Sequence, residues 1–359
     1  ATRRRDEGLK HVVGAVKAAA PRFPAKFDFL PLVQTSAKQH PSRLLRRVTR
    51  AWQERRVSNY EYLLVLNALG GRSFADPCSY PVFPWVLADY VSDRLDLDDP
   101  GSFRDLAKPM GALNEVRLAE TIARYETFVD PHVPPFHYGS HYSTSAGVVM
   151  HYLLRLTSFA QLHCELQGGK FDVADRLFAS VEDAWAANSG ARGASSGGEV
   201  KELTPEWFSS PAFLVTRGRL PLGASQDGDP VGDVALPPWA KTSPHAFVAA
   251  NRAALESDVA SAKLHEWVDL IFGHKQRGQA AVDAHNVFFY LCYADAIDLD
   301  KIDDKKLRAS TVLQASQFGQ CPTQLLATKP HAPRGAPPAK YRSPPRLLVA
   351  GAHVANRLD

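Results

Sequence analysis

The stretch that decides the fold is SNYEYLLVLNALGGRSFADPCSYPVFPW, residues Ser58 to Trp85. Ser58 and Glu61 have the spacing of a capping box, in which the serine side chain accepts an early amide proton and the carboxylate accepts the proton of the cap residue's own amide. The apolar residues after them recur at helical spacing. Gly70 and Gly71 then stand where a left-handed residue ends a helix at the lowest cost. We therefore expect a short helix that ends at the glycine pair.

The second half of this stretch is rich in aromatic residues and proline. Tyr80, Phe83 and Trp85 lie around Pro81 and Pro84. Proline fixes its own backbone, restricts the residue before it and donates no ladder hydrogen bond, so an extended, irregular path is expected. Large rings on such a path are most simply explained as core. The same packing role is expected of Trp52, Tyr60, Trp239 and Trp267.

Several longer motifs are arranged in order along the chain. They are PWVLADY (Pro84–Tyr90), FRDLAKPMGALN (Phe103–Asn114), VPPFHYGSHYS (Val133–Ser143), LQGGKFDVADRLF (Leu166–Phe178), VKELTPEWF (Val200–Phe208), LPPWAKTSPHAF (Leu236–Phe247), ALESDVASAKLHEWVDLIFGHKQRG (Ala254–Gly278), NVFFYLCY (Asn286–Tyr293) and FGQCPTQLL (Phe318–Leu326). Through these blocks the chain resembles the BEACH domain of neurobeachin and beige/Chediak-Higashi-type proteins. A small departure is Val268, where the family usually has isoleucine.

The resemblance implies a fold and a domain layout. It implies a mainly α-helical domain over residues 43–326, with helices packed around irregular extended segments and little β-sheet. Residues 1–42 would be a linker that comes after a pleckstrin-homology-like domain. Residues 327–359, with six prolines between Ala327 and Arg346, would be a proline-rich basic linker toward a WD40 region.

The resemblance also implies a function. It implies a non-catalytic scaffold module of a large cytosolic protein that acts in vesicle trafficking, lysosome-related organelle size or autophagy. The expected partners are other proteins or peptides and the preceding pleckstrin-homology-like domain of the same chain. Peripheral contact with anionic endosomal or lysosomal membranes is a further expectation.

Composition and charge fit this class. The chain has 359 residues, of which 45% are hydrophobic, and its four cysteines are isolated in sequence, as expected in a reducing cytoplasm. It does not begin with Met, which suggests a piece of a longer protein. Residues 1–56 carry 14 basic and 4 acidic side chains, a net charge of +10, and residues 327–359 carry 6 and 1, a net charge of +5. Because the net charge of the whole chain is +4, residues 57–326 have a net charge of −11. An acidic body argues against nucleic-acid binding. The basic ends would contact acidic lipid or protein, or be solvated.

Two groups of basic residues are candidates for partner binding. Leu44, Leu45, Val48 and Trp52 predict an amphipathic helix from residue 42, with Arg43, Arg46, Arg47 and Arg50 on its other side. HKQRG (His274–Gly278) places Lys275 and Arg277 in a short loop. We expect Arg46, Arg47, Arg50, Lys275 and Arg277 to contact a partner. The alternative for the loop is that Arg277 pairs with a core carboxylate and Lys275 is solvated.

No catalytic, cofactor-binding or metal-ligating residue is assigned. The sequence contains no GxSxG elbow, Walker loop or GxGxxG. His137 and His141 leave open an unrecognised metal-dependent hydrolase. Gly139 and two prolines disfavour a regular helix there, so we expect these histidines to bond loop backbone instead. Other helices are expected near residues 114–127, 145–167, 172–187, 244–255, 258–272, 279–293 and 303–317.

Overall fold

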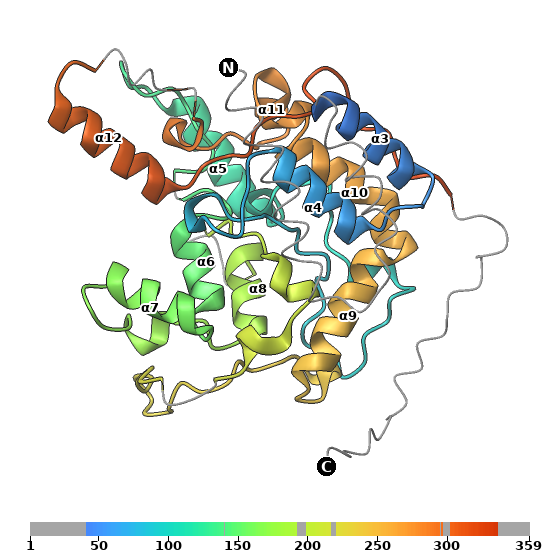
Figure 1. Ribbon diagram of the computed structural model, residues 1–359, viewed down its shortest axis with the longest axis vertical. Coiled ribbons are helices and arrows are strands. Elements are labelled where there is room, and N and C mark those ends of the chain that lie inside the picture. The colour runs from blue at the N-terminus through green and yellow to red at the C-terminus, as the bar shows by residue number, and fades with distance from the viewer. Residues whose placement is uncertain are drawn as a thin grey trace.

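The computed structural model describes residues 41–139, 141–191, 199–216, 220–294, 296 and 302–336. Most of the expected N-terminal linker, residues 1–40, and the end of the chain, residues 337–359, lie outside these ranges. The described part is rich in helix and has almost no strand, which confirms the mainly α-helical fold (Figure 1). None of the helices in it has the length and apolar character needed to cross a membrane.

The described ranges contain ten α-helices and short 3-10 turns. The α-helices are α3 (Pro41–Gln53), α4 (Asn59–Leu69), α5 (Glu115–Thr127), α6 (Ala146–Leu153), α7 (Thr157–Leu166), α8 (Val181–Ser189), α9 (Pro244–Glu256), α10 (Asp258–Ile271), α11 (Gln279–Asp283) and α12 (Lys305–Phe318). The 3-10 turns are η2 (Pro77–Ser79), η3 (Pro100–Ser102), η4 (Met110–Ala112), η5 (Ala174–Arg176), η6 (Pro205–Phe208), η7 (Pro211–Leu214), η8 (Pro238–Ala240), η9 (His274–Gln276) and η10 (Tyr290–Cys292). Strand pairing within these ranges consists of isolated bridges.

The helix expected at the start of the decisive stretch forms as predicted. The Ser58 side chain accepts from the Glu61 amide, and the Glu61 carboxylate accepts from the Ser58 amide, so the capping box of α4 is complete. Gly71, just past the end of α4, has φ 84°, in the left-handed region that glycine reaches without strain. Both ends of α4 are therefore fixed by local sequence.

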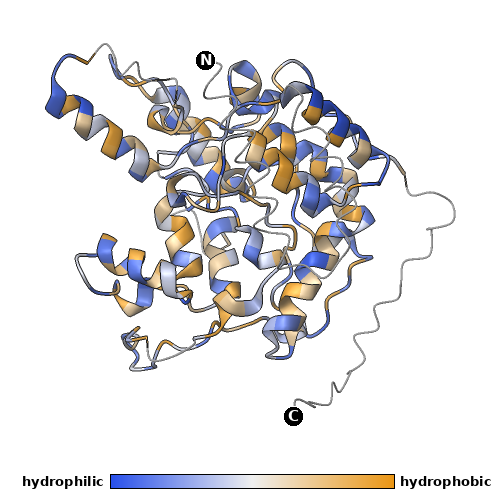
Figure 2. Ribbon diagram, in the orientation of Figure 1, coloured by the Kyte–Doolittle hydropathy of each residue, from blue (hydrophilic) through white to orange (hydrophobic). Residues whose placement is uncertain are grey.

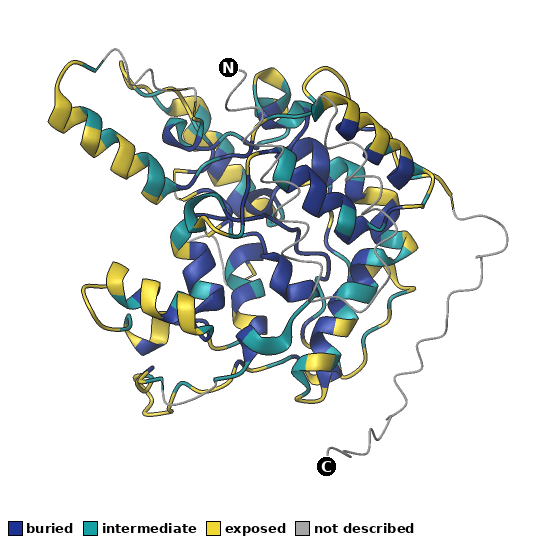
Figure 3. Ribbon diagram, viewed as in Figure 1, coloured by how far each residue is buried: buried dark blue, intermediate teal, exposed yellow. Residues whose placement is uncertain are grey.

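The extended segment after α4 runs through the interior. Asn67 of α4 holds it at one end, because its side chain donates to the Val82 carbonyl (2.9 Å) and accepts from the Val82 amide (2.8 Å). Phe83 forms an antiparallel bridge with Leu203. Every ring predicted to pack is buried: Trp52, Tyr60, Tyr80, Phe83, Trp85, Trp239 and Trp267. Figure 3 shows this buried chain at the centre, with exposed residues on α7, α12 and the outer side of α3.

A buried ion pair joins the extended segment to the helices. The Glu202 carboxylate accepts two hydrogen bonds from Arg104 Nη1 (2.9 and 2.7 Å), and the two side chains are 3% and 0% exposed. It also accepts from the Trp85 amide (3.0 Å) and from Trp267 Nε1 of α10 (2.9 Å). The Glu202 amide donates to the Ser143 carbonyl. One carboxylate thus connects four stretches of chain that are distant in sequence.

Three of the expected helices differ in the structure. The helix expected over residues 145–167 is broken into α6 and α7, because Arg155 turns inward and donates to the carbonyls of Phe178 (2.6 Å) and Gly232 (2.7 Å). Leu156 then adopts an extended backbone and begins α7. The helix expected over residues 172–187 starts only at Val181, where Ser180 caps α8.

The helix expected over residues 279–293 is also wrong beyond its first turn. α11 ends at Asp283, and His285 has φ 52°, which a helix cannot contain. Asn286 then uses its side-chain amide to donate to the Leu270 carbonyl (2.9 Å) and the Lys275 carbonyl (3.0 Å). The tertiary bonds of Asn286 therefore override the helical pattern of the sequence.

The substitution Glu202→Gln tests the central ion pair. It leaves Arg104 buried without its counter-ion, and we expect the free energy of unfolding in urea to fall by about 3–5 kcal/mol. Glu54→Gln is the matched control, because Glu54 pairs with Arg56 at the surface, where both side chains are about half exposed; it should cost less than about 1 kcal/mol. Equal, small losses for the two variants would contradict a central role for Glu202.

Candidate partner-binding surface

Helix α3 presents a basic face that its own core packing positions. Proline stands at the first residue, Pro41, where its missing amide proton costs nothing. One side of the helix is buried: Leu44, Leu45, Val48, Ala51 and Trp52. The opposite side exposes four arginines: Arg43, Arg46, Arg47 and Arg50. Figure 2 shows this outer side of α3 as hydrophilic. The structure therefore confirms the amphipathic helix, and the predicted contact residues on it are accessible.

The arginines of the basic face are spaced to match carboxylates on an extended or helical segment of a partner. Residues three and four apart on a helix are neighbours, so Arg43, Arg46, Arg47 and Arg50 form one row. Each guanidinium is a planar fork that fits carboxylate or phosphate oxygens. The Arg50 Nε lies 3.8 Å from the Glu54 carboxylate, and Arg50 is 80% exposed, so this pair competes only weakly with a partner.

The second basic group lies in a tightly held loop. In η9, the buried Gln276 side chain donates to the carbonyls of Ile271 and Pro322. Lys275 and Arg277 flank it and are half-buried. The Arg277 guanidinium lies over the Tyr293 ring, 4.9 Å from its centre. Arg277 thus contributes to packing, whereas Arg46, Arg47 and Arg50 of α3 point outward.

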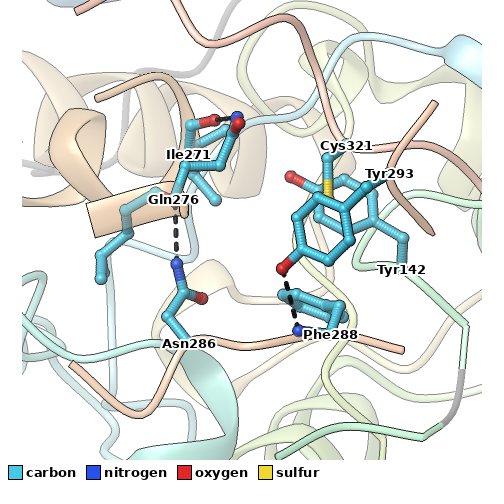
Figure 4. Close-up of a pocket in the computed structure, with 8 residues that line it drawn as sticks. Tyr142, Ile271, Gln276, Asn286, Phe288, Tyr293 and Cys321 are labelled. Carbon is cyan, nitrogen blue, oxygen red and sulfur yellow. Dashed lines mark hydrogen bonds between the residues drawn. The ribbon is translucent and has the colours of Figure 1, made fainter. Parts of the chain in front are cut away.

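A narrow crevice lies below this loop (Figure 4). It is too tight to admit a water molecule. The lining residues are Tyr142, Leu270, Ile271, Gln276, Asn286, Phe288, Tyr293 and Cys321. The Tyr293 hydroxyl accepts from the Phe288 amide (3.0 Å), which occupies one of its lone pairs. Burial raises the pKa of Tyr293.

One segment of the chain contacts both elements that carry the basic groups, α3 and η9. We call Pro322–Gly335 the C-terminal strap. The Pro322 carbonyl accepts from Gln276 of η9 (2.9 Å), and the Gly335 amide donates to the Gln53 carbonyl of α3 (3.0 Å). The strap includes residues 327–335, which the sequence assigns to a linker. In the structure, His331, Arg334 and Gly335 of this stretch contact the body of the protein.

The histidines considered as metal ligands contact different neighbours. His137 is buried (1% exposed), its ring stacks on Tyr125 at 4.3 Å, and its Nδ1 accepts from the Val287 amide (3.3 Å). His141 is exposed, with its ring 5.8 Å from that of Phe318. Within the part of the chain that the structure describes, no group of three or more His, Cys, Asp or Glu could hold a metal ion. As expected for loop histidines, His137 bonds backbone.

Several polar residues that hold the site together have no recognisable signal in the sequence. Asp269 of α10 is buried, and both its carboxylate oxygens accept from the His331 amide (3.0 Å each). Arg334 donates to the carbonyls of Trp52 and Val57. The proline density around His331 and Arg334 predicts a linker, and no pattern of spacing links them to residues almost 300 positions earlier.

Comparison with known proteins identifies the family. A family model described as Beige/BEACH domain matches residues 50–334. The chain belongs to the BEACH family. It is 50% identical over 307 residues to BEACH domain-containing protein B of Arabidopsis thaliana, covering 86% of this chain and 12% of that protein. It is 49% identical to BEACH domain-containing protein A2 of the same organism (86% and 8%) and 50% identical to its Protein SPIRRIG (80% and 8%). The chain therefore spans only about a tenth of the length of these BEACH proteins.

The pH dependence of stability tests the structural role of His137. Burial lowers the pKa of His137 to about 4, against about 6.5 in an unfolded chain. Its neutral ring therefore contributes fully above pH 6.5, and the contribution is lost as the pH falls toward 4, because the unfolded chain binds the proton first. We expect the stability difference between the native protein and His137→Phe, measured in urea, to shrink from pH 7.5 to pH 4.5.

The exposed Val129, which carries no titrating group, supplies the control for this titration. The difference between the native protein and Val129→Ala should stay constant over the same pH range. A difference for His137→Phe that does not change with pH would show that the ring is not held in its neutral form.

Proposed function

We propose that this chain is a non-catalytic protein-interaction scaffold module of a large BEACH protein. Its place of action would be the cytoplasm, peripherally at endosomal or lysosomal membranes, in vesicle trafficking, lysosome-related organelle size or autophagy. The observation that carries the proposal is the arginine face of α3, defined as Arg43, Arg46, Arg47 and Arg50. It is exposed, arranged in one row and held by a buried helix side.

The uses of the buried charges support a scaffold over an enzyme. The Arg117 guanidinium donates to the carbonyls of Met110, Gly111 and Asn188. The guanidinium of Arg155 likewise donates to backbone carbonyls, and Glu202 is occupied by Arg104 and two tryptophans. An active site would need ionisable groups that converge on a space open to substrate. These groups instead hold non-regular backbone in place.

The partner that best fits this face is an acidic protein segment. A helix or strand with carboxylates about 5–7 Å apart matches the spacing of neighbouring arginines on α3. Such a segment would come from another protein or from the preceding pleckstrin-homology-like domain. Phosphate-bearing lipid headgroups offer the same fork-shaped acceptors, so anionic membrane is the second candidate on the same observation.

Charge reversal on α3 tests the proposal. The triple change Arg46→Glu, Arg47→Glu and Arg50→Glu replaces three attractive contacts by repulsion. In the full-length protein, we expect it to weaken capture of bound proteins at least about tenfold and to abolish its salt dependence. The melting temperature should change little, because all three residues are exposed.

The matched control reverses the same number of charges elsewhere. Lys170, Lys305 and Lys306 are exposed near α7 and on α12, away from the basic face. Capture of the same proteins by the control variant should equal that of the native protein. Equal loss in both variants would mean that net charge, and not α3, attracts the partner. Sedimentation with anionic vesicles separates the two candidates: loss of vesicle binding alone, with protein capture intact, would favour the membrane.

A further inference from the structure

The C-terminal strap is attached to the body at two places separated by an exposed link. Its first part pairs with the end of α10, where the amides of Leu325 and Leu326 donate to the Phe272 carbonyl (2.8 and 3.0 Å). The link, Ala327–Pro330, is exposed throughout. The second part, His331–Gly335, returns to the surface of the body. The two attached parts are therefore separated by residues that are not buried.

His331 is the first attachment of the second part. Its ring Nε2 lies 2.6 Å from the Tyr62 hydroxyl of α4, and its ring is edge-on to Trp52 of α3. Its amide donates to both oxygens of Asp269, which is only 3% exposed. Detachment would leave a buried carboxylate without these two bonds, which is costly. The residue therefore holds the strap against three helices at once.

Arg334 is the second attachment, and it caps α3. Its Nε donates to the Trp52 carbonyl (3.2 Å), Nη1 to Asn59 Oδ1 (2.8 Å) and Nη2 to the Val57 carbonyl (2.7 Å). The next residue, Gly335, donates its amide to the Gln53 carbonyl. The last carbonyls of a helix have no partners within it, and a positive charge is favourable there. The strap thus supplies donors for the C-terminal end of α3.

We propose that His331–Gly335 is a releasable latch that fixes the C-terminal half of α3, so that events in the chain beyond Gly335 alter how the arginine face is presented. The latch acts through the buried His331 and the half-buried Arg334, and it swings about the exposed link. The role given to the arginine face rests on the proposed function, whereas the coupling between latch and α3 does not depend on it.

Hydrogen exchange measured by mass spectrometry tests this coupling without any partner. Arg334→Lys keeps the charge but cannot make the three-way fork, and His331→Ala removes the ring contacts with Tyr62 and Trp52. Each change should speed exchange of the amides of residues 50–56 and 331–335 by about tenfold or more, because side-chain hydrogen bonds that hold the strap against α3 and α4 are lost. Amides of α8 should exchange as in the native protein. Lys329→Ala, in the exposed link, is the control and should change neither region.

Two results would overturn the latch. Faster exchange in residues 331–335 with unchanged α3 would show that the strap does not hold the helix. Faster exchange in α8 by the same factor would show that the strap is part of the global core and does not open separately. Because the measurement uses no partner, either result leaves the charge-reversal test of the proposed function unaffected.

Discussion

The Glu202 carboxylate is the interaction on which the rest of the structure depends. It lies at the end of an extended segment, is nearly inaccessible, and accepts hydrogen bonds from the Arg104 guanidinium, the Trp85 amide and the Trp267 indole. A charge in such a place is unfavourable unless it is paired and its lone pairs are used. Each donor comes from a different stretch of chain, so these stretches must meet at Glu202 for the charge to be satisfied. The irregular core is specified by this requirement, since strand ladders are limited to isolated bridges in the described ranges.

Local signals could be predicted from the sequence, and long-range polar contacts could not. The capping box of Ser58 and Glu61 and the amphipathic side of α3 depend on residues within a few helical turns, so spacing reveals them. Asn286 ends a helical pattern because its amide bonds carbonyls 11 and 16 residues earlier. Arg155 breaks another pattern by donating across 77 residues to Gly232. A pattern of hydrophobic residues carries no information about such partners.

In the candidate site too, the short-range features could be predicted from the sequence and the long-range contacts could not. The arginine face of α3 is visible in the sequence as helical periodicity, and the structure leaves it exposed. The loop of Lys275 and Arg277 is visible only as two charges within a longer motif, and its geometry depends on Gln276 and Tyr293. The contacts of the strap are hidden, because proline-rich sequence predicts a linker wherever the partners are distant. The sequence within a few turns therefore indicates where the arginine face lies, and the long-range contacts of the strap fix its position.

Short-range and long-range contacts are distributed differently in the body of the protein and in α3. The body holds its charges in buried bonds to backbone, so a partner at the surface gains little by competing for them. α3 is different, because its inner side is anchored in the core while the cap at its C-terminal end comes from Arg334, 282 residues after Trp52. A helix whose last turn is completed by a distant segment responds to that segment as well as to its own sequence. The binding face that we propose on α3 would therefore be coupled to the chain beyond the strap, while its arginines stay anchored by the buried side of the same helix.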